Sequence, residues 1–325
     1  RITAEPAAGK RDFTGMCTPI RSAFSVLIAM AMSGEVLAEN YAILFVGGVN
    51  EQENHPRYPR QVRALYNALT DPARLGYLPE NVVILAADGT DPAVDRSDGH
   101  NTDWSDALAR GTRVLPGTAA NLRDEMRAWE TLTPVDMTFL FTYDHGSGTA
   151  DAPEITSEEQ LCAYEGPNVN DEELAAWASG VAAPRQAYVF CQCFAGGMLD
   201  ELAITPGSGM FGCASSNHYE NSYYSEIFHS AFAIEIVDGL QEQVDDTYTM
   251  YRCAYENDHF ATDGEGPGGT YEEYVEHPWK VGDNLDLAVA RWIGPPPGIG
   301  KGTPGFANPD NWGRAPNAMR TTCIE

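Results

Sequence analysis

The sequence predicts one α/β domain, a three-layer α/β/α sandwich with a mostly parallel central sheet. Short apolar runs, rich in β-branched and aromatic residues, alternate along the chain with segments of helical periodicity. Within these runs polar and apolar residues do not alternate, which is typical of parallel strands whose two faces are both buried. The length of 325 residues and the hydrophobic share of 43% suffice for one large core.

The strands are predicted where a short apolar run ends at glycine or at polar residues. In a parallel sheet the carboxyl ends of these runs lie at one edge, and binding sites are found beyond that edge. Right-handed crossovers through the intervening helices connect the strands. The predicted strands are 41–46, 81–86, 137–143, 186–191 and 209–214.

Helices are predicted where apolar residues recur at every third or fourth position. In the first of them Val62, Leu65 and Leu69 share one face. Thr118 is the expected N-cap of another, because its hydroxyl can accept a backbone N–H of the first turn. The predicted helices are 59–69, 118–129, 171–179, 225–240 and 245–257.

The two ends of the chain are expected to lie outside this domain. A basic residue, an apolar run and Ala38 follow one another as in a secretory signal; the alternative is an N-terminal core helix. Residues 1–38 are therefore interpreted as upstream residues with a signal peptide. Residues 39–293 would form the folded domain, and 294–325, rich in glycine and proline, a C-terminal strap. We expect a secreted or periplasmic protein without a membrane anchor.

Composition limits the expected partners. Asp and Glu number 47 against 20 Lys and Arg, so the formal net charge is −27. A surface this negative repels nucleic acid and anionic lipid, and neither is expected as a partner. The seven cysteines are too few for a disulfide scaffold in a chain of this length, although export would allow some bridges. Cys323 in the strap would then pair with Cys253 or Cys162, a choice that the sequence leaves open.

A histidine and a cysteine follow the third and fourth predicted strands. His145 and Cys193 each stand just beyond a strand end, and glycine follows each of them closely. Neighbouring strands would bring the two side chains together, and a cysteine nucleophile needs such an imidazole as its base or ion-pair partner. We therefore predict a catalytic pair, in preference to a histidine bonded to Asp144 and a merely buried thiol. Cys191 falls within the apolar run and is interpreted as a core residue.

Three motifs extend this pattern in the same order. Residues 141–146 (FTYDHG) are similar to Phe-Thr-Asp-His-Gly, 191–198 (CQCFAGGM) to Glu-Ala-Cys-Glu-Ser-Gly-Ser-Met, and 214–223 (ASSNHYENSY) to Ala-Ala-Asn-Pro-Arg-Glu-Ser-Ser-Tyr. These are stretches of legumain, so the chain resembles legumain-like cysteine peptidases of the caspase/legumain/gingipain superfamily, including their bacterial members, over roughly residues 41–290. Cys191 departs from the pattern, because legumain has a Glu of its substrate pocket there.

The resemblance implies a caspase-like fold and a secreted cysteine endopeptidase that needs no cofactor and acts on a peptide or protein substrate. Cys193 would attack the peptide carbonyl to form a thioester acyl-enzyme, and His145 would act as the general base. The backbone N–H groups of Gly146 and Cys193 would form the oxyanion hole.

The resemblance also implies a pocket for the residue before the scissile bond, between the loop after the first strand and the strand after the cysteine. These segments carry the candidate substrate-binding residues Arg57, Arg60, Ser215 and Ser216. An arginine there would favour Asp or Asn, because its planar guanidinium binds a carboxylate or an amide oxygen in a fork. As alternatives, both arginines are solvated residues at a helix start, and an inward-facing Glu220 would favour Arg or Lys.

Residues 88–103 form a polar loop with several carboxylates and glycine turns. Asp88, Asp91, Asp95 and Asp98 are candidate calcium ligands, because calcium prefers carboxylate oxygens. The spacing differs from that of an EF-hand loop, and an ordinary solvated loop is the alternative. The scattered histidines do not have zinc-ligand spacing, so no zinc site is predicted.

Other functions share parts of this pattern. A transpeptidase or ligase would use the same acyl-enzyme, with an amine in place of water. A peptidase-like binding module without activity is disfavoured by the intact His145 and Cys193. An oxidoreductase that uses Cys191 and Cys193 is disfavoured by their Cys-x-Cys spacing, which differs from the thioredoxin motif.

Overall fold

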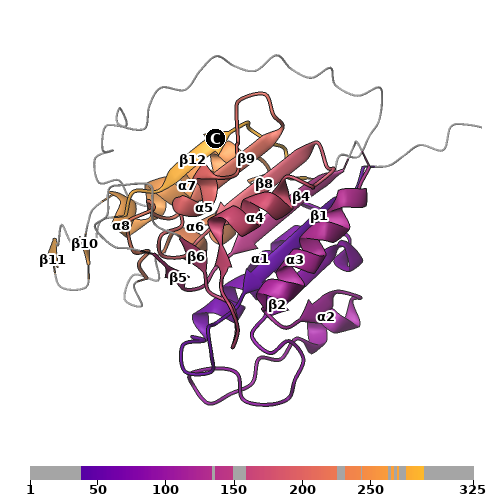
Figure 1. Ribbon diagram of the computed structural model, residues 1–325, viewed down its shortest axis with the longest axis vertical. Helices are drawn as coiled ribbons and strands as arrows, with labels where there is room; N and C mark the ends of the chain where they lie inside the picture. The colour runs from indigo at the N-terminus through magenta and orange to yellow at the C-terminus, as the bar shows by residue number, and fades with distance from the viewer. Residues whose placement is uncertain are drawn as a thin grey trace, which may run out of the picture. The chain divides into compact units, whose positions relative to one another are not determined.

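The computed structural model describes residues 38–133, 136–148, 159–224, 231–242, 244–262, 265–266, 269–270 and 276–288. The strands of its central sheet are β1 (Asn40–Val46), β2 (Val82–Ala86), β3 (Arg113–Leu115), β4 (Met137–Thr142), β8 (Arg185–Phe190), β9 (Met210–Ala214) and β12 (Trp279–Gly282). Their spatial order is β12–β9–β8–β4–β1–β2–β3 (Figure 1). All neighbouring pairs are parallel except that β12 runs antiparallel to β9. The predicted mostly parallel sheet is confirmed.

Helices cover both faces of this sheet. They are α1 (Arg57–Thr70), α2 (Ser105–Ala109), α3 (Ala119–Ala128), α4 (Asp171–Ala178), α5 (Gly197–Asp200), α6 (Phe232–Gln241), α7 (Thr247–Asn257) and α8 (His259–Thr262), with 3₁₀ helices at Pro79–Asn81 and Trp129–Thr131. Successive residues of a strand point to opposite faces. Leu44 of β1 therefore packs in one apolar cluster with Val62 and Phe232, while Phe45 packs in another with Leu122 and Leu174. The two clusters form the interfaces of the predicted three-layer sandwich.

Short strands outside the central sheet were not predicted. Three of them, β5 (Gly146–Ser147), β6 (Gln160–Leu161) and β7 (Val169–Asn170), form an antiparallel sheet that begins directly after His145. Two more form the hairpin of β10 (Glu265–Gly266) and β11 (Gly269–Thr270). Strands of two residues are too short to produce a recognisable hydrophobic period, so only the folded chain shows them.

The five predicted strands and the predicted helices are found, with shifts of a few residues at their ends. Thr118 caps α3 as expected, since its hydroxyl accepts the N–H of Asn121 at 3.2 Å. The helix predicted over 225–240 begins at Phe232, because Ala231 has an extended backbone; residues 225–230 lie outside the described part of the chain. The edge strands β3 and β12 were not predicted, because they are short and partly exposed and have no continuous apolar run.

Most residues of the two predicted terminal segments lie outside the part of the chain that the structure describes. This applies to the signal peptide except Ala38, and to the whole strap at 294–325 with Cys323. Cys253 is disulfide-bonded, whereas Cys162 has a free thiol, which rules it out as the anchor of the strap. In the described part of the chain, no helix has the length and hydropathy that a membrane span requires.

Candidate active site

The candidate site lies where the order of the strands reverses. From β1 the chain proceeds to β2 and β3 on one side, and β4 and β8 then lie on the other side of β1. Such a switch point leaves a crevice beyond the carboxyl ends of the strands, where ligands of α/β proteins bind. The loops that follow β1, β4 and β8, at residues 47–56, 143–146 and 191–196, meet there, and we call them together the strand-end junction.

The pairing of β4 with β8 brings the histidine and cysteine loops into contact. Their register aligns Thr142 with Phe190, so the two loops leave the sheet side by side. A Cβ atom added to Gly146 would lie only 1.9 Å from the carbonyl oxygen of Cys193. Only glycine allows this close approach of the two backbones. The structure therefore brings together His145, Gly146 and Cys193, which the sequence analysis predicted as the catalytic pair and the oxyanion hole.

The thiol of Cys193 lies in a largely buried position against the loop that contains Ser222. Its Sγ is 3.4 Å from the backbone nitrogen and 3.7 Å from the carbonyl oxygen of Ser222. Burial raises the pKa of Cys193, while the N–H groups of Ser222 and Gly146 and the positive charge of Arg57 act in the opposite direction. The cysteine therefore rests as a thiol, and a base must remove its proton before it can act as a nucleophile.

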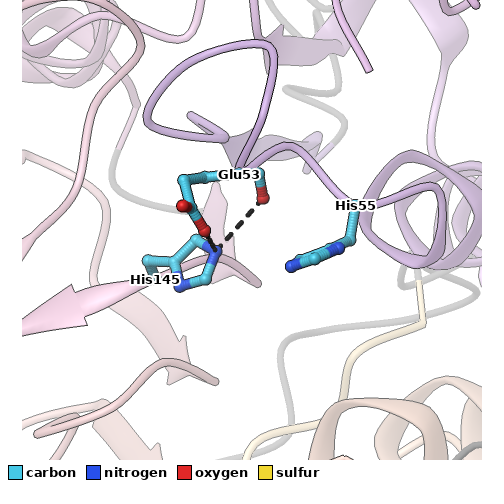
Figure 2. Close-up of side chains that lie close together, drawn as sticks. All are labelled: Glu53, His55 and His145. Atoms are coloured by element: carbon cyan, nitrogen blue, oxygen red, sulfur yellow. Dashed lines mark hydrogen bonds and ion pairs between the residues drawn. The ribbon is translucent and has the colours of Figure 1, made fainter. Parts of the chain in front are cut away.

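His145 has the properties of such a base. Its Nε2 lies 3.1 Å from the carbonyl oxygen of Glu53 and 3.2 Å from the hydroxyl oxygen of Tyr58 (Figure 2 shows the contact with Glu53). A carbonyl oxygen only accepts, so we assign the proton to Nε2 and the lone pair to Nδ1. Burial lowers the pKa of His145 below its ordinary value of 6.5. At neutral pH the site thus combines a neutral imidazole with a neutral thiol, as general-base catalysis requires.

Asp144 connects the loop that contains His145 with the loop after β1 through hydrogen bonds. Its carboxylate is buried; one oxygen accepts the N–H of His145 at 2.6 Å and the other accepts the N–H of Gly48. Burial raises its pKa to about 7, although the N–H groups that it accepts oppose the shift. A Cβ atom on Gly47 would lie 2.8 Å from this carboxylate. Asp144 is therefore a positioning residue for the backbone of His145.

Ser215 and Ser216 support the cysteine loop from beneath. Both are fully buried, and their hydroxyls donate to the carbonyl oxygen of Gln192 at 3.3 and 3.4 Å. The hydroxyl of Ser216 also accepts the N–H of Ala195 at 3.4 Å. Phe194 has a left-handed backbone with φ of 60°, an arrangement that is costly for a residue with a side chain. These contacts hold the turn that follows Cys193.

The two candidate arginines occupy different environments. Arg57 is half-buried; its guanidinium carbon lies 4.7 Å from the ring centroid of Tyr58 and 4.8 Å from that of Tyr224. It donates to the hydroxyl of Tyr58 at 3.1 Å, and its charge acts on Cys193 and on His145. Arg60 is exposed on α1. The structure thus brings Arg57, but not Arg60, to the catalytic pair.

Three of the four candidate carboxylates in the loop 88–103 are held by their own neighbours, whereas Oδ1 of Asp88 is buried without a hydrogen-bond partner among the described residues. Asp95 accepts the N–H and the hydroxyl of Thr102 at 2.8 and 3.2 Å. Asp98 is paired with Arg96 at 2.7 Å, and Asp91 accepts the N–H of Ala93 at 2.9 Å. For Asp88, burial and then the charges of Asp95 and Asp91 raise the pKa to about 6. In this loop, which is described throughout, the four candidate calcium ligands form no common cluster.

Sequence reasoning missed several residues that contact His145 and Cys193. Glu53 contributes its backbone carbonyl, Tyr58 a hydroxyl, and Ser222 a backbone N–H and carbonyl. Backbone groups have no signature in a sequence, so Glu53 and Ser222 could not be found from it. One signal in the sequence could have found Glu53 and Tyr58. Both stand in the segment after the first predicted strand, where the resemblance places one wall of the substrate pocket.

Comparisons with known proteins assign no family to this chain. No family model matches it, and a search of curated proteins finds no match. A solved structure with some similarity is protein GSU0716 from Geobacter sulfurreducens. The two are 12% identical, the alignment covers 75% of this chain and 94% of the other, and the TM-score is 0.45. These values are too low to carry over a family or an activity.

Proposed function

We propose that this protein is a cysteine endopeptidase of the legumain-like kind, with Cys193 as nucleophile and His145 as general base. The observation that carries the proposal is the contact of the two loops at the ends of β4 and β8, where Gly146 lies against the backbone of Cys193. A thiol and a neutral imidazole at adjacent strand ends form the minimal machinery for acyl transfer.

The reaction follows from the protonation states of the two side chains. Nδ1 of His145 takes the proton of the thiol as Sγ attacks the carbonyl carbon of the substrate. The N–H groups of Gly146 and Cys193 are the donors to the oxyanion of the tetrahedral intermediate. The imidazolium then protonates the leaving amine, and a thioester remains on Cys193. Water, deprotonated by His145, hydrolyses the thioester and releases the acid.

Arg57 is the residue that we propose to select the substrate. Its positive charge acts on the thiol of Cys193, and its Nε is buried without a hydrogen-bond acceptor among the described residues. A buried donor without a partner is costly, and a carboxylate or amide oxygen of a bound peptide would satisfy it. We therefore expect Asp or Asn before the scissile bond. Ser215 and Ser216, which are fully buried, would act by holding the cysteine loop.

A peptide library tests the proposal. Wild-type protein should cleave peptides after a restricted set of residues, and Cys193→Ala should abolish this cleavage. Cys191→Ala is the matched control, because Cys191 is buried in the apolar core two residues away. It should lower the free energy of unfolding by about 1 kcal/mol and retain cleavage.

Mass spectrometry of the products also separates the competing functions. Hydrolysis yields free acids, whereas a transpeptidase would join the acyl fragment to an added amine. Cleavage that persists in Cys193→Ala would contradict the catalytic pair. If the wild-type protein binds peptides from the library but cleaves none of them, a binding module replaces the enzyme.

A further inference from the structure

Two side chains from the loop after β1 and His145 of the proposed catalytic pair point toward one another. Glu53, His55 and His145 each offer one ligand atom, and these atoms lie within 4.8 Å of one another. Figure 2 shows Glu53 and His55 approaching the Nε2 side of the His145 ring. Oε2 of Glu53 is 3.9 Å from Nε2 of His145, and the two imidazole centroids are 5.8 Å apart. Among the described residues this is where histidine and carboxylate ligands gather.

We propose that Glu53, His55 and His145 form a binding site for a divalent transition-metal ion such as Zn²⁺, and that the bound ion inhibits the enzyme. The metal site follows from the geometry of the three side chains. Its inhibitory effect rests on the proposed peptidase function, because His145 is also the general base.

The ligand set selects a transition metal. Two imidazoles and a carboxylate are typical zinc ligands, and they leave a fourth position to water. Calcium and magnesium prefer oxygen ligands alone, so imidazoles disfavour them. Tetrahedral zinc with bonds of about 2.0–2.2 Å spaces its ligand atoms about 3.4 Å apart. The Glu53 side chain is 53% exposed, so it is free to rotate the short distance that this spacing requires.

The backbone around the three side chains is already fixed. The side chain of Asn50 accepts the N–H of Glu53 at 3.1 Å, and the buried side chain of Asn54 donates to the carbonyl of Asp95 at 2.7 Å. The N–H of His145 is held by Asp144. Metal binding therefore has to order side chains only, which keeps its entropic cost low.

A metal on Nε2 would disable the base. A neutral imidazole has one N–H and one lone pair. In the metal-free site Nε2 donates its proton to the carbonyl of Glu53, so Nδ1 has the lone pair that accepts the proton of the thiol. With the metal on Nε2, the single proton of the neutral ring resides on Nδ1. His145 then has no lone pair for the proton of Cys193, and acyl transfer stops without any change to the thiol.

Binding is tested with Zn²⁺ alone, independently of any peptidase activity. The full chain with Cys193→Ser, which removes the thiol next to the site as a competing ligand, is titrated with ZnCl₂ against a chromophoric chelator. One equivalent should bind. His55→Gln and Glu53→Gln should each weaken binding at least about tenfold, since even loss of a supporting group costs 10- to 100-fold. The control is His100→Gln, an exposed histidine of the loop 88–103 that should not affect affinity.

Inhibition is tested on the protein with an intact Cys193. One equivalent of Zn²⁺ should suppress peptide hydrolysis, EDTA should restore it, and His55→Gln should require at least about tenfold more Zn²⁺ for the same fractional inhibition. Thermal melting verifies that each variant is folded. Absence of binding, or binding that His55→Gln and Glu53→Gln leave unchanged, overturns the metal site. Binding without inhibition of an active wild-type enzyme overturns the inhibitory role. A protein that hydrolyses no peptide even without zinc refutes the proposed function, while the titration still decides the metal site.

Discussion

Two polar regions follow parallel strands of the central sheet, and only one of them brings distant side chains together. At the strand-end junction, the loop after β1 places Glu53 and His55 beside His145, and the loops after β4 and β8 are in contact at Gly146 and Cys193. In the loop 88–103, which follows β2 alone, Asp91, Asp95 and Asp98 are bonded to their own neighbours, as Asp98 is to Arg96. The difference shows that a site in such a sheet is recognised by residues that come together from the loops of several adjacent strands. A high density of polar residues within one loop is a weaker sign, because such residues can satisfy one another locally.

The largest effect should come from adding one methyl group at the junction. Gly146→Ala would place a Cβ atom 1.9 Å from the carbonyl oxygen of Cys193, which forces the two loops apart. A displacement of about 1 Å in an active site can cost about 100-fold in rate, so kcat/KM for peptide hydrolysis should fall by about that factor.

The matched control for this variant lies in the other region. Gly99→Ala has open space around its Cβ and only a positive φ of 78° to accommodate. It should lower the free energy of unfolding by about 1 kcal/mol and leave kcat/KM unchanged. Equal rates for Gly146→Ala and the wild type would mean that the two loops are not in contact in the active enzyme.

The second prediction compares the loss of stability when one buried carboxylate from each region, Asp144 or Asp95, is replaced. Asp144 accepts N–H groups with both oxygens, so Asp144→Asn turns one acceptor into a donor that faces an N–H. The free energy of unfolding should fall by about 1–3 kcal/mol. Asp95→Asn retains the one oxygen that accepts both groups of Thr102, so a smaller loss is expected in denaturant titration. A larger loss for Asp95→Asn would contradict the assigned roles.

The loss in Asp144→Asn should depend on pH. Burial raises the folded-state pKa of Asp144 to about 7, above its ordinary value of 3.8. With this raised pKa, the carboxyl of Asp144 contributes fully to stability below pH 3.8, where it is protonated in both the folded and the unfolded protein. The contribution is lost as the pH rises from there through 7. The variant lacks the titration, so its deficit against wild type should shrink between about pH 5 and about pH 8. A deficit that stays constant over this range would show that the carboxyl is already ionised in the folded protein.

Burial at the junction should also shift the pH profile of the proposed peptidase activity. Because burial lowers the pKa of His145, the base is already neutral at mildly acidic pH. The acidic limb of kcat/KM should therefore have its midpoint below 6.5, the ordinary value for histidine. The measurement is the rate of hydrolysis of one good substrate across pH. A midpoint above 6.5 would indicate an imidazolium held by a carboxylate or a thiolate, and would refute the neutral pair.

The smallest effect is expected from calcium. Since the carboxylates at positions 91, 95 and 98 already have partners, adding calcium or EGTA should change Tm by less than about 1 °C. Differential scanning calorimetry measures this directly. A clear rise in Tm with calcium that is lost in Asp88→Asn would restore the loop 88–103 as a metal site.

The sequence was informative where buried strands left a continuous apolar signal. The runs that became β1, β4 and β8 are buried along nearly their whole length, and the polar residues after them were recognised as site candidates. The edge strand β12 was missed because its half-buried residues produce no such signal. Ser215 and Ser216 were predicted as substrate-binding residues, whereas in the structure both are fully buried and donate to the carbonyl of Gln192.

The sequence by itself determined the fold class and pointed to the two side chains that we propose as nucleophile and base, because buried strands and nucleophilic chemistry each favour particular residue types. The tertiary structure alone decided which groups surround them. It placed the carbonyl of Glu53 on Nε2 of His145, and it brought His55 to the same imidazole across 90 residues of chain (145 − 55). Histidines without ligand spacing in the sequence thus became a candidate metal site. The physical reason is that backbone hydrogen bonds and contacts between adjacent strands depend on the order of the strands in the sheet, which no local pattern of residues records.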